Sequence, residues 1–250
     1  MTIITHLGVG EAFDPTKSNN SHLIETSKTT LLLDCGYQIP RQIWKYNNDS
    51  NFVDYIYISH LHADHYFGLS PLLMWMAEEQ RTKPLTIFIG PENTKPLKDV
   101  LEYGYFGITK KLAFPLEFLE LNEQKTYENE KFFLQIAKTK HSVKNYAVSV
   151  EIDNKKISYS GDGMVTKESE KLYDKSDVLI HECYTVEKQL SGHTNLKALI
   201  EMIQQIEIKN LVLTHLQREE RSKIQKEITK ALHKSSTTIL MPEPLQQTKL

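Results

Sequence analysis

The stretch ISHLHADHYFGL, residues 58–69, places three histidines and an aspartate within six positions of a chain that holds only ten histidines. A strand-like run, FVDYIYIS, leads into it, and a helix-like repeat of apolar residues from Leu69 to Met76 follows it. Functional side chains gather where strands end. The stretch therefore predicts layers of strands and helices with a metal site at the edge of a sheet.

The polar residues of this stretch are spaced for two metal ions. His60 and His62 are two positions apart, so on extended backbone both side chains point the same way and can share one ion. Asp64 and His65 lie at the turn into the helix and can face a second point close by. Zinc takes ligands of these types, and two metals about 3.5 to 4 Å apart can clamp the attacking and leaving oxygens of a hydrolysis.

Further ligands for such a pair are predicted at the ends of later strand-like runs. His141 follows FFLQIAKTK, Asp162 follows KISYSG, and His215 follows NLVLT. A single polar residue at a strand end is more often a plain terminus than a ligand. Together, on an edge where functional residues gather, the three fit one site with the 58–69 stretch.

Apolar periodicity along the chain indicates two mixed β-sheets packed together, with helices on the outer faces. Additional strand-like runs are HLIET, TTLLLDCG, LTIFIG, LEFLEL, YAVSVEI, DVLIHE and TTILMPE. Helical patterns cover residues 69–76, 196–203 and 218–233. Early strands are expected in hairpins without helices between them, and later strands in alternation with helices. We expect a single domain over residues 1–250.

The composition is that of an ordinary globular protein. Hydrophobic residues make up 40% and charged residues 25% of the chain, and the net charge is -2. This balance provides no general basic surface for nucleic acid. The chain shows neither a signal peptide nor a long apolar run, so we expect a cytoplasmic protein without a membrane segment. Cys35 and Cys183 adjoin strand-like runs and are expected as buried thiols rather than as a disulfide.

These residues resemble the metallo-β-lactamase superfamily, and within it ribonuclease Z most closely. The similar segments follow in order through nearly the whole chain: LGVGEAFDPTKSNNS, LLLDCG, SHLHADHYFGL, SGDG, IHECYT, SGHTNLKAL and LVLTHLQ. The HxHxDH motif marks the superfamily, whereas the ordered later segments are more specific. The resemblance implies an αββα sandwich, class α/β (α+β), with a dinuclear metal site at one edge.

The resemblance also implies roles for individual residues. It places His60, His62 and His141 on one metal, Asp64, His65 and His215 on the other, and Asp162 as a bridge between them. It makes Asp34 a carboxylate that orients a ligand histidine, although a strand-end cap is an equal alternative. Asp64 could orient the attacking water, and His193, paired with Glu182, would protonate the leaving oxygen. The ions are expected to be two zinc, with manganese or iron suited to the same ligands.

The chain departs from ribonuclease Z between His141 and Asp162. That enzyme carries there a long arm, rich in glycine and proline, that grips tRNA. This chain has only SVKNYAVSVEIDNKKISYSG, enough for a two-stranded hairpin with its turn at DNKK, so tRNA is not expected as the substrate. Gly163 also replaces the threonine of the family's GDT segment, with no consequence readable from sequence.

The charge state of His193 is equally open at this point. A helix that begins near Thr194 would favour the neutral imidazole through its dipole, whereas Glu182 would favour the imidazolium. His181 is expected to be structural, and no role is predicted for His6, His22 or His233.

Three functions are compatible with these residues. The first is a dinuclear hydrolase of small phosphodiesters, such as cyclic nucleotides, nucleotide derivatives or short RNA. The second keeps the fold and the metals but hydrolyses a carbonyl substrate such as a lactone, thioester or β-lactam. The third is a non-catalytic, regulatory metal-binding module, which the presence of every expected ligand argues against. The resemblance leaves a homodimer open, and no membrane partner is expected.

Overall fold

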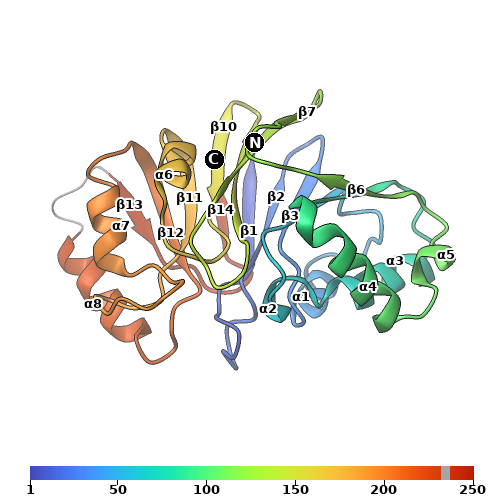
Figure 1. Ribbon diagram of the computed structural model, residues 1–250, viewed down its shortest axis with the longest axis horizontal. Coiled ribbons are helices and arrows are strands. Elements are labelled where there is room, and N and C mark those ends of the chain that lie inside the picture. Colours follow the sequence, from blue (N-terminus) through green and yellow to red (C-terminus); the bar gives the residue numbers. More distant parts are fainter. Residues whose placement is uncertain (232–236) are drawn as a thin grey trace.

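The computed structural model describes residues 1–231 and 237–250, which form two seven-stranded β-sheets packed face to face (Figure 1). The first sheet has the order β14 (Gln247–Lys249), β1 (Ile3–Gly8), β2 (Ser21–Glu25), β3 (Thr30–Leu33), β4 (Tyr55–Ile58), β5 (Leu85–Ile89) and β6 (Leu116–Glu120). The second has the order β13 (Thr238–Leu240), β12 (Ile208–Thr214), β11 (Ser176–Glu182), β10 (Lys155–Tyr159), β9 (Tyr146–Ile152), β8 (Phe132–Lys138) and β7 (Tyr127–Glu128).

Helices cover the outer face of each sheet. The helices beside the first sheet are α1 (Ile39–Tyr46), α2 (Ala63–Tyr66), α3 (Leu69–Glu78), α4 (Thr94–Gly104) and α5 (Ile108–Lys111), with a short 3-10 turn at Pro91–Asn93. Those beside the second are α6 (Lys167–Tyr173), α7 (Leu196–Met202) and α8 (Arg221–Ala231). The predicted αββα sandwich of two mixed sheets is confirmed. The predicted last helix extended to His233, and residues 232–236 lie outside the described part of the chain.

Alternation of side chains along the strands builds the core. Leu31 and Leu33 of β3, with Tyr57 of β4, face the second sheet and pack in the layer between the sheets. Leu32 and Ile56, one position along, face the helices of the first sheet. Strands β3 and β4 are therefore apolar on both faces, which fixes their register and holds their ends at a defined place on the sheet edge.

The predicted division into early hairpins and later helices was wrong for most of the first sheet. Strands β1, β2 and β3 are consecutive and antiparallel with no helix between them, as expected, whereas β3, β4, β5 and β6 are parallel neighbours. Parallel neighbours need a crossover, and α1 to α5 provide these connections. Conversely, β7 to β10 in the second half are consecutive antiparallel strands.

The turn between β9 and β10 consists of two residues. Asp153 and Asn154 have φ values of +48° and +58°, the left-handed conformation that a tight two-residue hairpin requires. The segment before Asp162 is thus the short hairpin that the sequence predicted.

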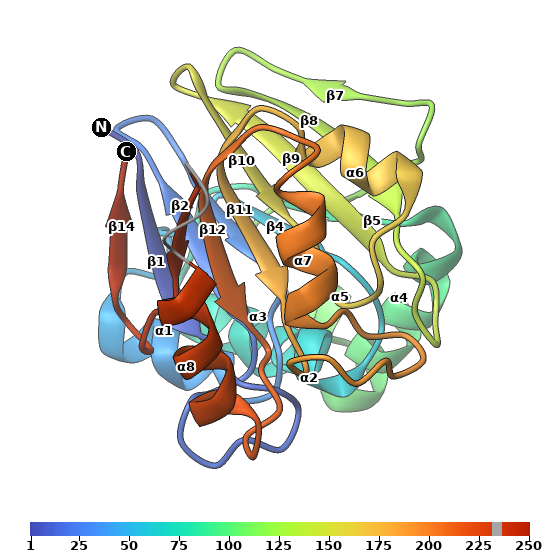
Figure 2. The ribbon, with the colours of Figure 1, turned by 90° about the vertical axis from the view of Figure 1, so that its left-hand side faces the viewer.

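Strands β11 and β12 point the same way, toward the edge at which α2 lies (Figure 2). Strand β4 ends two residues before His60, and β12 ends one residue before His215. The two halves of the chain thus bring their polar strand ends to one edge of the sandwich.

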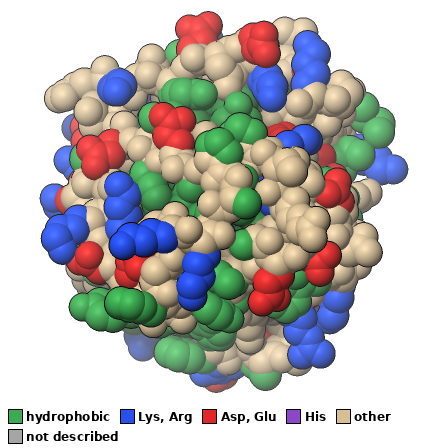
Figure 3. Space-filling model, turned by 90° about the vertical axis from the view of Figure 1, so that its right-hand side faces the viewer, with side chains coloured by type: hydrophobic (Ala, Val, Ile, Leu, Met, Phe, Trp, Pro, Cys, Tyr) green, Lys and Arg blue, Asp and Glu red, His purple; other side chains and the backbone are tan. Residues whose placement is uncertain are grey.

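The outer face over α3 to α5 shows positive and negative side chains interspersed, with no continuous basic area (Figure 3). Within the described residues, no helix is long and apolar enough to cross a membrane. Cys35 and Cys183 are buried free thiols, as predicted.

Candidate metal centre

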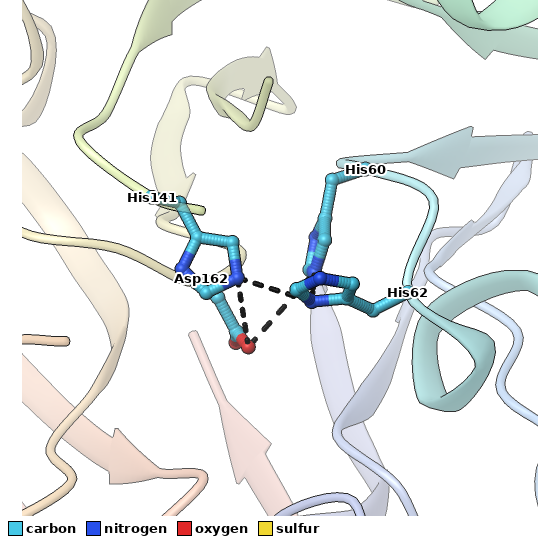
Figure 4. A group of neighbouring side chains, drawn as sticks. All are labelled: His60, His62, His141 and Asp162. Atoms are coloured by element: carbon cyan, nitrogen blue, oxygen red, sulfur yellow. Dashed lines mark hydrogen bonds and ion pairs between the residues drawn. The ribbon is translucent and has the colours of Figure 1, made fainter. Parts of the chain in front are cut away.

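The structure brings the seven predicted metal ligands together in two groups that share one carboxylate. The first group is His60, His62, His141 and Asp162, whose side chains converge in Figure 4. The second is Asp64, His65, His215 and Asp162. The residues come from the segments that follow β4, β8, β10 and β12. Four strand ends from both sheets thus meet at one point.

The second group has the spacing of a tetrahedral ion. His65 Nε2 lies 3.3 Å from Asp64 Oδ2 and 3.4 Å from Asp162 Oδ2. His215 Nε2 lies 3.4 Å and 3.3 Å from the same two oxygens. A tetrahedral zinc with bonds of about 2.0 to 2.1 Å separates neighbouring ligand atoms by about 3.3 Å. Four buried atoms therefore surround a space of the right size for a metal ion.

The first group is more open. His62 Nδ1 lies 3.1 Å from both His60 Nε2 and His141 Nε2. Asp162 Oδ2 lies 3.9 Å from His60 Nε2 and 4.0 Å from His141 Nε2. Both His62 and His141 are only partly buried as whole residues. This group is therefore the less buried of the two.

Asp34 determines which nitrogen His65 and His60 offer to the cluster. Its carboxylate can only accept, so it receives the His65 Nδ1–H at 2.7 Å and the Ser59 hydroxyl proton at 2.7 Å. The Ser59 oxygen must then accept from His60 Nδ1 at 3.0 Å. Nε2 of both histidines is left as a lone pair facing the metal space. Asp34 also accepts from the Ser59 amide at 2.7 Å, so it caps the strand and orients ligands at once.

His141 is oriented from another direction. Its Nδ1–H donates to the Gly192 carbonyl at 2.7 Å, which leaves Nε2 for the cluster. Asp162 Oδ1 is buried with no hydrogen-bond partner among the described residues. A buried carboxylate oxygen without a partner is costly, and a cation would satisfy it. The residues present therefore fit a pair of divalent metals.

The charges around Asp162 favour positive charge in this space. Burial alone would lower the pKa of His215, but Asp162 and Asp64 outweigh it and raise that pKa to about 9. Burial would raise the pKa of Asp64, but His65 and His215 hold it below its usual range. The clustered carboxylates thus stabilise whichever cation occupies the site.

His193 and Glu182 lie beside the second group. Glu182, the last residue of β11, is fully buried and accepts from His193 Nδ1 at 3.0 Å and from the Thr194 amide at 3.0 Å. The Tyr184 ring stacks on His193 with ring centroids 4.4 Å apart. His193 and His215 have ligand atoms within 4.8 Å of one another. His193 is thus held at the metal centre with its Nδ1 committed to Glu182.

The charge of His193 depends on its distance from the start of α7 and on its contact with Glu182. Helix α7 begins at Leu196 with Asn195 as its N-cap, two residues beyond His193 rather than next to it. Burial lowers the pKa of His193, but the hydrogen bond and the charge of Glu182 prevail and raise it. Glu182 therefore outweighs burial and favours the imidazolium.

The packing around position 163 explains why a glycine stands there. Gly163 has φ +113°, and a Cβ there would lie 2.5 Å from Thr139 Oγ1. The Thr139 hydroxyl donates to the Asp162 carbonyl at 2.7 Å, and Asn145 donates to Thr139 at 2.6 Å. Thr139 thus occupies the space that a side chain at 163 would need, so a larger residue there requires Thr139 to move.

Sequence analysis did not predict Ser59, Thr139, Tyr184 or Gly192 as parts of the site. Ser59 could have been noticed as the polar residue directly before the motif. The other three touch the site only through contacts between distant segments. His181, expected to be structural, is buried, and its Nδ1 donates to the Glu182 carbonyl at 2.7 Å.

The chain has the metallo-β-lactamase fold, its sequence is similar to ribonuclease Z, and its two His/Asp clusters could hold metal ions. YhfI from Bacillus subtilis, a metallo-β-lactamase fold protein, superposes with a TM-score of 0.84 over 99% of this chain and 98% of its own, at 19% identity. The short form of human tRNase Z has a TM-score of 0.79 over 99% and 98% of the two chains, at 22% identity. A family model described as anti-Pycsar protein Apyc1 matches residues 2–239, and the chain belongs to that family.

Ribonuclease Z from Thermoplasma acidophilum is 37% identical over 121 residues, which is 48% of this chain and 38% of that protein. The match thus spans less than half the length of this relative. The resemblance to ribonuclease Z noted in the sequence is confirmed.

The packing around Gly163 can be tested with a matched pair of alanine substitutions. Gly107 also has a positive φ, +75°, but nothing lies within 4 Å of a Cβ there. We expect Gly107→Ala to lower the free energy of unfolding by about 1 to 2 kcal/mol from backbone strain alone. Gly163→Ala should cost about 1 to 3 kcal/mol more, because Thr139 must move. Urea unfolding of the metal-free proteins measures both, and equal losses would contradict the crowding at position 163.

Proposed function

We propose that the protein is a dinuclear zinc phosphodiesterase that cleaves small nucleotide or short RNA phosphodiesters. The observation that carries the proposal is the His193–Glu182 pair beside two metal clusters joined through Asp162. The paired clusters suit activation of a water, and the imidazolium suits protonation of a leaving alkoxide. The relatives named ribonuclease Z support phosphodiester chemistry.

His60, His62 and His141 would hold one ion, Asp64, His65 and His215 the other, and Asp162 both. When bound, two such ions lower the pKa of a shared water and polarise a phosphoryl oxygen. Asp64 has its Oδ2 between His65 and His215, next to the shared carboxylate. From this place it can orient the attacking water.

His193 supplies the proton for the leaving oxygen. Its Nδ1 is held by Glu182, so Nε2 is the nitrogen free to donate. Glu182 raises the pKa of the ring and so favours its protonated form, and the stacked Tyr184 ring restricts its tilt. Both contacts favour a proton donor at this place.

The size of the substrate is inferred from what surrounds the site. The β9–β10 hairpin before Asp162 closes with a two-residue turn, which leaves no room for an arm that grips tRNA. The net charge of -2 offers little general attraction to a polyanion. Both features favour cyclic nucleotides, nucleotide derivatives or short RNA over folded tRNA.

A substrate panel tests the reaction class. We expect zinc-loaded protein to hydrolyse bis(p-nitrophenyl) phosphate and nucleoside 3′,5′-cyclic phosphates, and to lose this turnover in the presence of a chelator. Ester, thioester and nitrocefin substrates should react poorly. A clear preference for the carbonyl substrates, or efficient cleavage of precursor tRNA, would contradict the proposal.

The leaving group reveals whether His193 acts as the acid. His193→Ala should lower kcat about 10²- to 10⁴-fold on an alkoxide-leaving nucleotide, the usual effect of losing a general acid or base. The loss should be much smaller on bis(p-nitrophenyl) phosphate, because p-nitrophenolate leaves without a proton. Zinc content must be measured in parallel, since ligand atoms of His193 and His215 lie within 4.8 Å. Equal losses on both substrates, or loss of a zinc, would refute the acid role.

Glu182 should set the alkaline limit of the rate. Because Glu182 raises the pKa of His193, the imidazolium persists to higher pH than in free histidine. Glu182→Gln removes the charge, lowers that pKa, and should move the alkaline limb of the kcat profile to lower pH. A profile measured on an alkoxide-leaving substrate checks this, and an unchanged or upward-shifted limb would contradict it.

A further inference from the structure

Two histidines outside the metal centre form a buried pair. His6 on β1 and His22 on β2 are opposite one another in the sheet, and neither is exposed to solvent. Their Nδ1 atoms lie 3.0 Å apart, so one ring must donate and the other accept. Burial lowers the pKa of His6 to about 4 and that of His22 well below its usual value, so both rings are neutral at neutral pH.

The pair belongs to a longer chain of hydrogen bonds that ends at the metal centre. His22 Nε2 lies 2.9 Å from Asn20 Oδ1, and Asn20 Nδ2 lies 3.2 Å from the Tyr159 hydroxyl. That hydroxyl lies 2.7 Å from Asp34 Oδ2, the carboxylate oxygen that also holds His65. At the other end, His6 Nε2 lies 3.0 Å from Thr248 Oγ1 on β14. We call the side chains of Thr248, His6, His22, Asn20 and Tyr159 the relay.

Every donor in the relay follows from Asp34. A carboxylate only accepts, so Tyr159 must donate its proton to Asp34 and accept from the Asn20 amide. Asn20 then presents its carbonyl oxygen to His22, whose Nε2 must carry a proton. The unprotonated Nδ1 of His22 therefore accepts from His6 Nδ1–H.

The direction of the last hydrogen bond, at β14, follows from the proton on His6. His6 carries its proton on Nδ1, so its Nε2 accepts from the Thr248 hydroxyl. The relay thus has one direction throughout, with each dipole aimed toward Asp34. Aligned hydrogen bonds in a buried chain polarise and strengthen one another.

We propose that the relay is a positioning device for the metal centre, in which His6, His22 and Asn20 orient the Tyr159 hydroxyl so that it holds Asp34 against His65. The surroundings of Asp34 show why its carboxylate has to be held in place. The carboxylate is buried and its only ion-pair partner among the described residues is His65. It therefore depends on the dipoles of Tyr159 and Ser59 to stay in place. The inference rests on the proposed metal centre and is independent of which bond the enzyme cleaves.

The first test is the tautomer of each relay histidine, read from nitrogen chemical shifts of the metal-free wild-type protein labelled with 15N-histidine. We expect His6 to carry its proton on Nδ1 and His22 on Nε2, both neutral between about pH 5 and 8 because of burial. The reverse tautomers, or a charged ring in this range, would overturn the direction of the relay.

The second test uses two tyrosines that are equally buried, Tyr159 in the relay and Tyr173 outside it. Tyr159→Phe should weaken zinc binding about 10- to 100-fold, the usual cost of losing a group that orients a ligand. Tyr173→Phe should leave zinc affinity within about twofold of wild type. His22→Phe should weaken zinc binding in the same direction as Tyr159→Phe, but less.

Zinc affinity is measured by competition with a chromophoric chelator on protein confirmed as folded by circular dichroism. A lowered Tm with unchanged zinc affinity for Tyr159→Phe would reduce the relay to a structural feature and overturn the proposal. A wild-type protein that binds zinc without phosphodiesterase activity would refute the proposed function but leave the relay intact. A wild-type protein that binds no zinc would refute both.

Discussion

The Asp162 carboxylate is the contact on which the rest of the site depends. Its Oδ2 lies between 3.3 and 4.0 Å from ligand nitrogens of four histidines, and the residue is almost fully buried. A buried charge is tolerated only when opposite charge or hydrogen bonds compensate it. Protons on the surrounding histidines can provide that charge in the metal-free protein, and two shared cations would provide it better. The fold places the ligand histidines, Asp64 and the ends of four strands around this one carboxylate.

A second ring of contacts determines how the ligands face Asp162. Asp34 orients His65 directly and His60 through Ser59, while the Gly192 carbonyl orients His141. Glu182 does the same for His193. Asp34 follows β3 in the first sheet, and Glu182 ends β11 in the second, so the packing of the two sheets positions these partners relative to one another. Strands β3 and β4 are apolar on both faces, which leaves little freedom for their ends to move.

The sequence predicts the metal ligands much better than it predicts the residues that orient them. His60, His62, Asp64 and His65 are close in sequence, so spacing alone brings them together, and the strand-end positions of His141, Asp162 and His215 indicate the remainder. The contact between Tyr159 and Asp34 joins residues 125 positions apart, and that between His6 and Thr248 joins residues 242 apart. No local pattern encodes such contacts. Helices α1 and α4 were not predicted from the sequence.

The central claim is that two metals share Asp162 at the edge of the sandwich. Anomalous X-ray diffraction at the zinc edge, on crystals grown with zinc, tests it most directly. The account predicts two peaks about 3.5 to 4 Å apart, the usual separation in two-metal hydrolases, one beside His60, His62 and His141 and one beside Asp64, His65 and His215. A single peak, or zinc bound away from Asp162, would contradict it.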